Sequence, residues 1–508
     1  MRQLVARVAV VAAIVVVCSA HVGSPDAWFE GNAGPYHVVV QVATPGVVPG
    51  IANVYTRVDG PGIEQVTVQA NRFDALAAAP PPEVAEPVDG DPGLYAAPLW
   101  IMSGGSNSVT VDVRGSLGTG KVIVPVVVVP NRRLELDPMF GAVLAAVGLF
   151  LFVGLITIIG AAFRESVLPP GEVPDTRRKW KARWAMAVAS AIVAVALVGG
   201  AQWWDLEDSR FNRSIFKPLK ASAAIASTSN GKILDLRISD SIWMMRNDTA
   251  WLRKNSASRW TPLLPDHGKL MHMFMVREPD LLAFAHLHPS SADTVGFSSV
   301  LPPLPAGRYR VYGDIVHESG FTQTLSAKVD LPEVIGPNAK PTDPDDASHV
   351  AAAPPNDKSA TLEDGSLITL ERGAGFVEGK DASLRFTVVD RNGKPLSLEP
   401  YIGMEGHAVV SRDDGAVFVH LHPSGTISMA SQMAFMMRQP GDTIAGRLGQ
   451  RMKASESMHS MTAVPANGVI SFPYAFPKPG KYHIWVQVKH DGRILTGAFA
   501  FEVRPAKT

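Results

Sequence analysis

Two apolar segments long enough to cross a bilayer place the strongest constraint on this chain. They run from Met139 to Phe163 and from about Trp184 to Trp204, and a membrane-spanning helix needs about 20 consecutive apolar residues. The loop between them is rich in Arg and Lys, which keeps a short loop in the cytoplasm. We therefore predict a transmembrane hairpin over residues 138–204 that anchors the chain in the cell membrane. Both flanking regions should then face the periplasm or the exterior.

The first 20 residues resemble a secretory signal peptide, because Arg2 and Arg7 precede an apolar run that ends in small residues. The small residues Cys18 and Ala20 favour cleavage after Ala20. Lipidation of Cys18 is the alternative, although Val17 is a poor match for the small residue that usually precedes a lipidated cysteine. Cys18 is the only cysteine. Its removal excludes disulfides, Cys-based zinc sites, iron–sulfur clusters and a Cys nucleophile from the mature protein.

The exported regions are expected to be mainly β. Alternating apolar and polar residues between turns predict short strands, and the 40 prolines and 44 glycines of the chain supply many turns. We predict three immunoglobulin-like β-sandwich domains outside the membrane, over residues 21–137, 205–336 and 360–508. The Pro- and Asp-rich stretch 337–359 is predicted to be a disordered linker. In the first domain the clearest strand patterns are Tyr36–Ala43, Asn53–Val58, Gln65–Asn71, Asn107–Gly115 and Lys121–Val129.

The last two domains look like copies of one unit. The first contains HGKLMHMFMVREPDLLAFAHLHP at 267–289 and AGRYRVYGDIVHESG at 306–320. The second contains MEGHAVVSRDDGAVFVHLHP at 404–423 and PGKYHIWVQVKHDG at 479–492. In both, a histidine precedes an HLHP tetrad by 13 or 14 residues, and a later Gly-Arg/Lys-Tyr has a histidine ten residues after its glycine. Four matches in the same order indicate an internal repeat.

The repeated histidines have the spacing of metal ligands. Alternate residues of a strand point to the same face, about 7 Å apart, so both histidines of HLHP can approach one ion and a paired strand can add a third. We predict the ligands His272, His286, His288 and His317 in the first unit, and His407, His420, His422 and His490 with the thioether of Met404 in the second. The sequence leaves open whether these form two sites or one shared site.

Histidine without thiolate suits copper, zinc or nickel, and thioether favours Cu(I). Met271, Met273 and Met275 alternate around His272, and a further seven methionines follow the second HLHP. Copper is therefore expected before zinc. Cleavage at the predicted site would also make His21 the N-terminal residue, whose α-amine and imidazole together chelate Cu(II).

Each pattern also has a structural interpretation. The HLHP histidines can bond to backbone groups while the proline ends the strand, and a stripe of methionines suits a half-buried strand. Met429, Met433 and Met436 have helical spacing and can form the apolar face of a short helix that Pro440 ends.

With these residues the chain resembles exported copper-handling β-sandwich proteins of the CopC and YtkA-like type. The shared features are a signal peptide that ends before a histidine, the immunoglobulin-like strand pattern and the His- and Met-rich HLHP units. The resemblance implies a periplasmic copper carrier with an N-terminal histidine ligand, which corresponds to His21 alone. The chain has only two membrane spans, without charged residues in their apolar core, whereas the copper importers fused to that family have more spans. The resemblance therefore does not extend to transport across the membrane.

We therefore expect a membrane-anchored copper-binding protein that buffers, senses or delivers the metal, with a partner protein in the cell envelope. The alternative is a non-enzymatic interaction or scaffold module with structural histidines. Catalysis is not expected, since the sequence contains no nucleophile elbow, HExxH, phosphate loop or nucleotide fingerprint. Equal numbers of basic and acidic residues, 47 each, argue against nucleic-acid binding.

Overall fold

The computed structural model covers most of the chain. It describes residues 21–22, 26–75, 79–169, 171–228, 231–240, 243, 262–333, 341–373, 375–439, 442, 444–456 and 467–506. The predicted signal peptide, including the choice between cleavage and lipidation of Cys18, lies outside these residues. Contacts divide the chain into two units: one holds the residues up to Val128 and from Lys217 onward, and the other holds Val129–Phe216.

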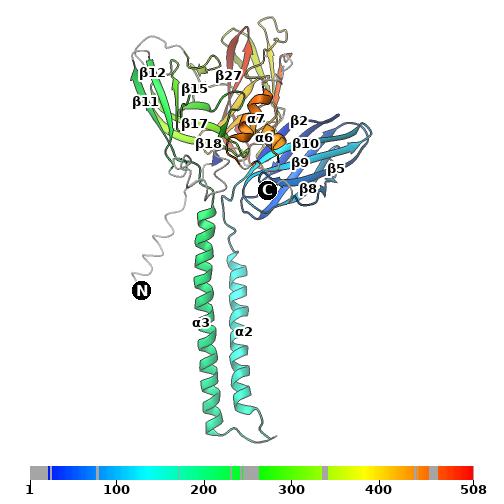
Figure 1. Ribbon diagram of the computed structural model, residues 1–508, viewed down its shortest axis with the longest axis vertical. Helices are drawn as coiled ribbons and strands as arrows, with labels where there is room; N and C mark the ends of the chain where they lie inside the picture. The colour runs from blue at the N-terminus through cyan, green and yellow to red at the C-terminus, as the bar shows by residue number, and fades with distance from the viewer. Residues whose placement is uncertain are drawn as a thin grey trace. The chain divides into compact units, whose positions relative to one another are not determined.

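The smaller unit holds two long helices, α2 (Pro138–Glu165) and α3 (Thr176–Ser214), which lie side by side (Figure 1). Asp137 and Asp175 cap their N-termini by accepting hydrogen bonds from backbone N–H groups. Each helix contains a stretch long and apolar enough to cross a membrane, with almost all its side chains exposed. The prediction of two membrane-length helices is therefore confirmed, and the side on which their loop lies stays a prediction. At 39 residues α3 is longer than predicted and measures about 58 Å at a rise of about 1.5 Å per residue.

The first β region of the larger unit consists of two antiparallel sheets, in the orders β2-β3-β4-β8-β7 and β10-β9-β5-β6. Valines at alternate positions of these strands fill one shared core. All five predicted strands lie within or overlap observed ones, while β2 and β8 were not predicted. The strands are β2 (Asp26–Ala33), β3 (Tyr36–Ala43), β4 (Gly50–Asp59), β5 (Ile63–Arg72), β6 (Glu83–Val84), β7 (Glu86–Pro87), β8 (Leu94–Ile101), β9 (Gly105–Gly115) and β10 (Gly118–Val128).

The first HLHP region also forms two sheets around an apolar core, in the orders β11-β12-β16 and β13-β17-β14-β15-β19, with β18 paired to β17. Its strands are β11 (Ala221–Thr228), β12 (Gly231–Ile238), β13 (Leu263–Leu264), β14 (His272–Glu278), β15 (Ala283–Leu287), β16 (Gly296–Val300), β17 (Gly307–His317), β18 (Thr322–Leu331) and β19 (Ala347–Val350).

The second HLHP region repeats this plan with sheets β20-β21-β22-β25 and β1-β24-β23-β26-β27. The order β24-β23-β26-β27 matches β15-β14-β17-β18, so the internal repeat is also a repeat of topology. Its strands are β20 (Ser359–Thr361), β21 (Leu367–Glu371), β22 (Leu384–Val389), β23 (His407–Arg412), β24 (Val417–Leu421), β25 (Val469–Phe472), β26 (Gly480–His490) and β27 (Arg493–Val503), and its inserted helices are α6 (Met429–Met437) and α7 (Arg447–Glu456). Strand β1 (His21–Val22) pairs in parallel with β24.

The predicted disordered linker at 337–359 is wrong over the part that the structure describes, 341–359. Strand β19 in this stretch pairs with β15, aligning Ala347 with His286. The preceding aspartates are not merely solvated, because Asp343 and Asp345 form ion pairs with Lys269. A Pro- and Asp-rich composition suggested disorder, but the free edge of β15 and the half-buried ammonium of Lys269 supply partners for this segment.

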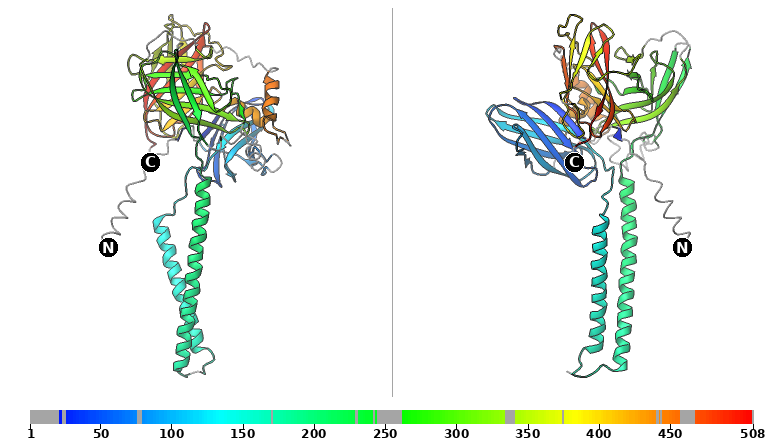
Figure 2. Two further views of the ribbon diagram at one scale, coloured as in Figure 1. Left: turned by 60° about the vertical axis from the view of Figure 1, so that its left-hand side comes forward. Right: turned by 180° about the vertical axis from the view of Figure 1, so that it is seen from behind.

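The repeats pack face to face through their matching sheets, as two views show (Figure 2). Phe284 of β15 stacks on Trp485 of β26 with ring centroids 4.8 Å apart, and Tyr312 of β17 stacks on Phe418 of β24 at 3.8 Å. These aromatic rings belong to one fully buried apolar layer between the two sheets. The layer positions the histidines described next, which continue it along the same strand faces.

Candidate metal centre

Two β-hairpins bring the predicted histidines together. In the first, β14 pairs with β15 so that Phe274 lies opposite His286, which sets His272 beside His288 at the end of the ladder. In the second, Val409 lies opposite His420, which sets His407 beside the second histidine of HLHP. In both repeats a paired strand therefore adds a third histidine beside HLHP, as the sequence predicts.

The two hairpins face each other and merge their histidines into one group. We call it the seven-histidine cluster: His267, His272, His286, His288, His407, His420 and His422. Rings from the two repeats are near neighbours, with centroids 5.2 Å apart for His272 and His420 and 5.6 Å apart for His286 and His420. Both HLHP motifs therefore contribute to one shared cluster.

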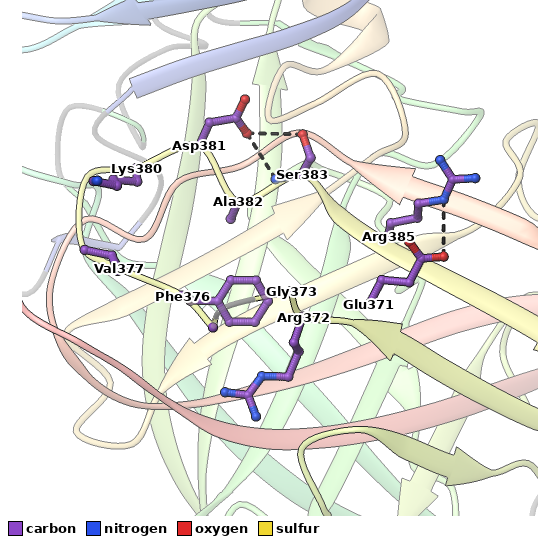
Figure 3. Close-up of a pocket in the computed structure, with 11 residues that line it drawn as sticks. Glu371, Arg372, Gly373, Phe376, Val377, Lys380, Asp381, Ala382, Ser383 and Arg385 are labelled. Atoms are coloured by element: carbon purple, nitrogen blue, oxygen red, sulfur yellow. Dashed lines mark hydrogen bonds and ion pairs between the residues drawn. The ribbon is translucent and has the colours of Figure 1, made fainter.

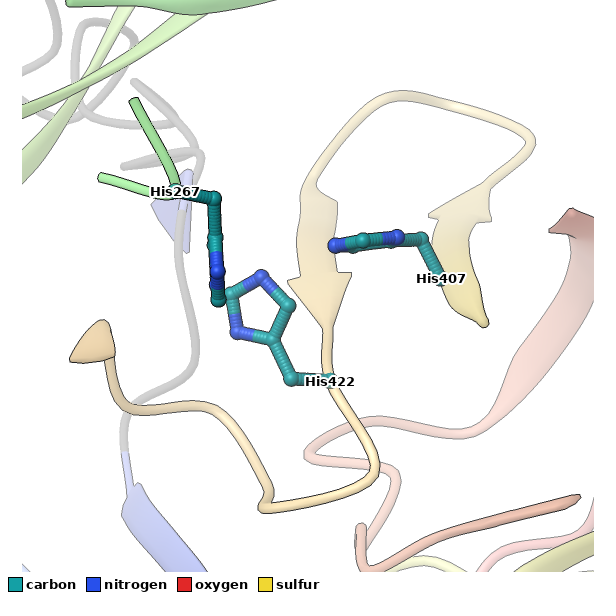
Figure 4. A group of neighbouring side chains, drawn as sticks. All are labelled: His267, His407 and His422. Atoms are coloured by element: carbon teal, nitrogen blue, oxygen red, sulfur yellow. The ribbon is translucent and has the colours of Figure 1, made fainter. Parts of the chain in front are cut away.

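Within the cluster two triads have the spacing of metal ligands. The first is His272, His286 and His288, and the second is His267, His407 and His422, and in each triad the ligand nitrogens lie within 4.8 Å of one another. Figure 4 shows the second triad, in which the ring of His422 lies close to that of His267 and the ring of His407 lies beside them; the three come from separate segments. The side chains of the cluster are almost completely excluded from solvent.

Most of the rings are held by an acceptor on one nitrogen. Nδ1 of His286 donates to Oε1 of Gln487 at 2.8 Å, and Nδ1 of His422 donates to the Ile427 carbonyl at 3.2 Å. Such outer contacts fix the tautomer and orientation of a metal-binding imidazole. Similar contacts join His272 Nε2 to the Asp266 carbonyl at 3.3 Å, His288 Nδ1 to Asp346 at 3.2 Å and His420 Nδ1 to Asp314 at 3.5 Å.

Several other ring nitrogens of the cluster have no hydrogen-bond partner. Nδ1 of His272 and Nε2 of His286 face each other at 3.1 Å. Buried ring nitrogens that have no hydrogen-bond partner among the described residues are Nε2 of His267, His288, His420 and His422 and both nitrogens of His407. Buried polar atoms normally have partners, since leaving one unsatisfied costs about 1–3 kcal/mol. A bound cation would give several of these nitrogens a partner at once.

Burial favours the neutral form of five of these imidazoles. Loss of solvation, reinforced by the neighbouring rings, lowers the pKa of His272, His286, His407 and His420 well below the usual value. Burial also lowers the pKa of His422 to about 4. Neutral imidazole is the form that binds a metal. The cluster is therefore prepared for metal binding at neutral pH.

Two predicted ligands lie outside the cluster for the same geometric reason. Asp314 pairs directly with His272, and Gln487 pairs with His407. Asp314 and Gln487 therefore lie on the strand faces that carry the cluster. His317 follows Asp314 by three positions, and His490 follows Gln487 by three. An odd offset along a strand places a side chain on the opposite face. His317 instead contacts Trp243 and Gln323, and His490 Nδ1 donates to the Ser397 carbonyl.

The other predicted ligands are less closely tied to the cluster. Met404 is buried in a turn where its backbone pairs with Tyr401, and its role as a ligand stays a prediction. The backbone of His21 pairs with Val417 in β1, and its role as a chelate also stays a prediction. Sequence reasoning missed His267, although it begins the quoted HGKLMH segment, because its position in a turn has no strand periodicity.

Met271, Met273 and Met275 belong to the core of the first HLHP region, on the face of β14 opposite His272. The structural interpretation of this stripe is therefore correct, and these thioethers do not serve the cluster. The prediction for the helix at Met429 is correct only in part. Helix α6 forms, but its buried face is made by Ala430, Ala434 and Phe435, with Met433 and Met437 partly buried. Met436, which the helical spacing predicts on that face, is 64% exposed. Two of the seven methionines that follow the second HLHP, Met458 and Met461, flank His459 in the sequence, and all three lie outside the described residues.

A separate surface pocket of about 380 Å³ lies in the second HLHP region (Figure 3). Within its lining, Arg385 lies 3.4 Å from Glu371, and Asp381 accepts hydrogen bonds from the backbone N–H and the hydroxyl of Ser383 at 3.1 Å. Arg372 pairs with Asp357, outside the lining, and we assign no ligand to this pocket.

Comparison with known proteins gives limited information. Residues 360–446 and 447–505 match a family described as a domain of unknown function, DUF8832. No curated protein matches the chain in sequence.

Among solved structures, latent PorU from Porphyromonas gingivalis is 8% identical over 95% of this chain and 34% of that chain, with a TM-score of 0.14. Salmonella alpha-2-macroglobulin reacted with methylamine is 8% identical over 95% and 23%, with a TM-score of 0.18. The ICAM-5 D1–D4 ectodomain fragment is 10% identical over 93% and 100%, with a TM-score of 0.14. The chain thus spans well under half of the first two structures, and similarities this low carry no argument about function.

Proposed function

We propose that this chain is a membrane-anchored extracytoplasmic protein that binds copper in the seven-histidine cluster and buffers or delivers the metal. One contact carries the proposal: Nδ1 of His272 faces Nε2 of His286 at 3.1 Å. The other nitrogen of each ring is bonded to an oxygen acceptor, the Asp266 carbonyl or the Gln487 amide. In the tautomers that donate to these two oxygens, both facing nitrogens carry lone pairs, and a cation between them removes their repulsion.

A metal ion fits this position better than a proton. Burial lowers the pKa of both rings well below the usual value, so a protonated imidazole is unfavourable here. Two imidazole nitrogens on one tetrahedral ion lie about 3.3 Å apart when each bond is about 2.0–2.1 Å. The observed distance of 3.1 Å between His272 and His286 is close to that value.

Copper is the first choice among metals. The donors are all imidazole, which suits copper, zinc and nickel, and Cu²⁺ has the highest intrinsic affinity of the divalent first-row ions for nitrogen sites. Zinc is the alternative. The methionine stripe around His272 gives no support at the site, because it lies on the opposite face of the strand.

The closed environment supports binding rather than catalysis. His286 is fully buried, and His407 is 1% exposed. Structural metal sites are closed, whereas catalytic sites keep an open coordination position for substrate. A carrier role also agrees with α2 and α3, whose apolar stretches can anchor the chain in a membrane. The predicted signal peptide and the basic loop between the helices both favour a location of the β regions outside the cytoplasm.

The test is metal binding by the full-length chain, purified in detergent and stripped with a chelator. Titration with Cu(I), Cu(II) and Zn(II) should give tight copper binding and a raised melting temperature, because a ligand at 100 times its Kd stabilises by about 2.7 kcal/mol. The double variant H272A/H286A should lose copper at that position.

The matched control is H490Q, which removes an HLHP-unit histidine that lies outside the cluster. Its copper content should equal that of the wild type. Failure of the wild-type chain to bind any added metal contradicts metal binding, and a preference for zinc over both copper ions contradicts the choice of metal.

A further inference from the structure

The seven-histidine cluster has more donors than one metal ion uses. A first-row ion in a histidine site commonly takes about four ligands, and the cluster offers seven imidazoles. One ion would leave at least three buried rings without a metal bond. Their unpaired nitrogens would lose the hydrogen bonds that water makes to them in the unfolded chain, which is unfavourable. A single ion therefore does not account for the partnerless nitrogens of both triads.

The two triads form two ligand groups side by side. In each group the three ligand nitrogens lie within 4.8 Å of one another. Ring centroids in the second triad are 5.1, 5.2 and 5.9 Å apart, and His407 lies 6.1 Å from His286 and 6.4 Å from His272 of the first triad. Two adjoining groups of three nitrogens suit two neighbouring ions.

His420 lies between the triads. Its ring is 5.2 Å from His272 of the first triad and 4.5 Å from His422 of the second. Its Nε2 is buried without a partner among the described residues, while Nδ1 faces Asp314. His420 is thus placed to complete the coordination of an ion on either side.

We propose that the cluster is a dinuclear metal centre, in which His272, His286 and His288 hold one ion, His267, His407 and His422 hold a second ion beside it, and His420 lies between the two. This inference rests on the proposed function and adds the number and arrangement of the ions. The second site needs both repeats, because His267 comes from the first and the other two ligands come from the second.

The two repeats also support each other's histidines. Asp314 and Gln487 occupy the same position of the repeat, seven residues after the glycines Gly307 and Gly480. Each reaches across to a histidine of the other repeat, Asp314 to His420 at 3.5 Å and Gln487 to His286 at 2.8 Å. The proposed centre therefore depends on the packing of one repeat against the other.

The test is a copper titration of the full-length chain combined with electron paramagnetic resonance. The wild type should bind two Cu(II) per chain, and magnetic coupling between neighbouring ions should leave much less signal than the copper content predicts. H288Q and H422Q should each bind one Cu(II) and show a full signal from it. H490Q is the control and should keep two coupled ions.

Each outcome separates the two proposals. One copper per wild-type chain overturns the dinuclear centre and leaves the proposed function standing. Two ions with full, uncoupled signal overturn their side-by-side arrangement. No copper at all overturns both. Circular dichroism and the metal-free melting temperature of each variant show that it is folded, and H288N with H422N provides a second pair of substitutions if the glutamine variants are unfolded.

Discussion

Gln487 on β26 accepts a hydrogen bond from Nδ1 of His286 on β15 at 2.8 Å, although the two residues lie 201 positions apart. The contact joins the two repeats and fixes the tautomer that leaves Nε2 of His286 unprotonated. Gln487 is itself held in orientation by Thr496, which accepts from its Nε2 at 3.3 Å. An outer residue of one repeat thus orients a proposed ligand of the other.

Replacing Gln487 by leucine should weaken copper binding by about 10–100-fold, because outer partners of ligating histidines have effects of this size. Q487E keeps an acceptor and should retain most of the affinity. The matched control is Q323L, which removes the glutamine beside His317, outside the cluster. Competition against a copper chelator measures the copper affinity of Q487L, Q487E and Q323L. Equal affinities for Q487L and Q323L would show that Gln487 does not orient a ligand.

Stability of the metal-free protein should fall as the pH drops below about 6.5. Burial lowers the pKa of five cluster histidines in the folded state, so below 6.5 the unfolded chain binds more protons than the folded one. Stability then rises with pH, by at most about 1.4 kcal/mol per pH unit for each such histidine.

Asp314 has the opposite effect. Burial raises the pKa of Asp314 to about 7 from 3.8. Its contribution to the stability of the folded protein is therefore fully present below about pH 3.8 and is lost as the pH rises through about 7. One carboxyl offsets only one of the five histidines, and the net slope stays positive. Urea unfolding at pH 7.5 and 5.5 measures this slope, and H272Q/H286Q should reduce it. A flat profile would contradict neutral burial of the histidines.

Gly425 should not accept a side chain. It has a φ of +113°, and a Cβ there would lie 2.1 Å from the Trp28 carbonyl oxygen. The loop that holds Gly425 pairs with β2 through Phe29 and connects His422 to the first β region. G425A should destabilise the protein by more than G403A, whose φ of +74° has open space around it. For G403A we expect about 1–2 kcal/mol, and thermal unfolding compares the two variants.

Trp485 anchors the interface between the repeats. It stacks on Phe284 with an interplanar angle of 7° and is 1% exposed. W485A should cost about 3–5 kcal/mol of stability and should also lower copper affinity, since the cluster continues the same interface. W100A, at a tryptophan that is 63% exposed, should change neither quantity. If folded W485A bound copper with unchanged affinity, the interface between the repeats would not contribute to the geometry of the metal site.

The topology prediction is accessible to cysteine labelling. A cysteine at Glu172, between α2 and α3, should react with a membrane-impermeant thiol reagent only after the cells are permeabilised, because a basic loop stays inside. A cysteine at Asp330, an exposed position of β18, should react in spheroplasts without permeabilisation. Labelling of Glu172→Cys from outside would reverse the orientation.

The sequence by itself determined the local features of this protein. Period-two alternation identified β14 and β15 and assigned the methionine stripe to the face opposite His272, because side-chain direction in a strand depends only on position parity. The same local rule identified the HLHP spacing and the pairing of His272 and His407 with it. The two long apolar helices followed from length and composition.

Only the tertiary structure decided that both repeats share one cluster, since the faces of two sheets meet through contacts such as Phe284 with Trp485. Periodicity says which side chains share a face but not what that face meets. Strand register excluded His317 and His490, and a turn supplied His267. The order of the segment 341–359 also depended on a distant partner, the free edge of β15. The local pattern therefore limits which histidines can share a strand face, whereas long-range packing selects the histidines that come together in the cluster.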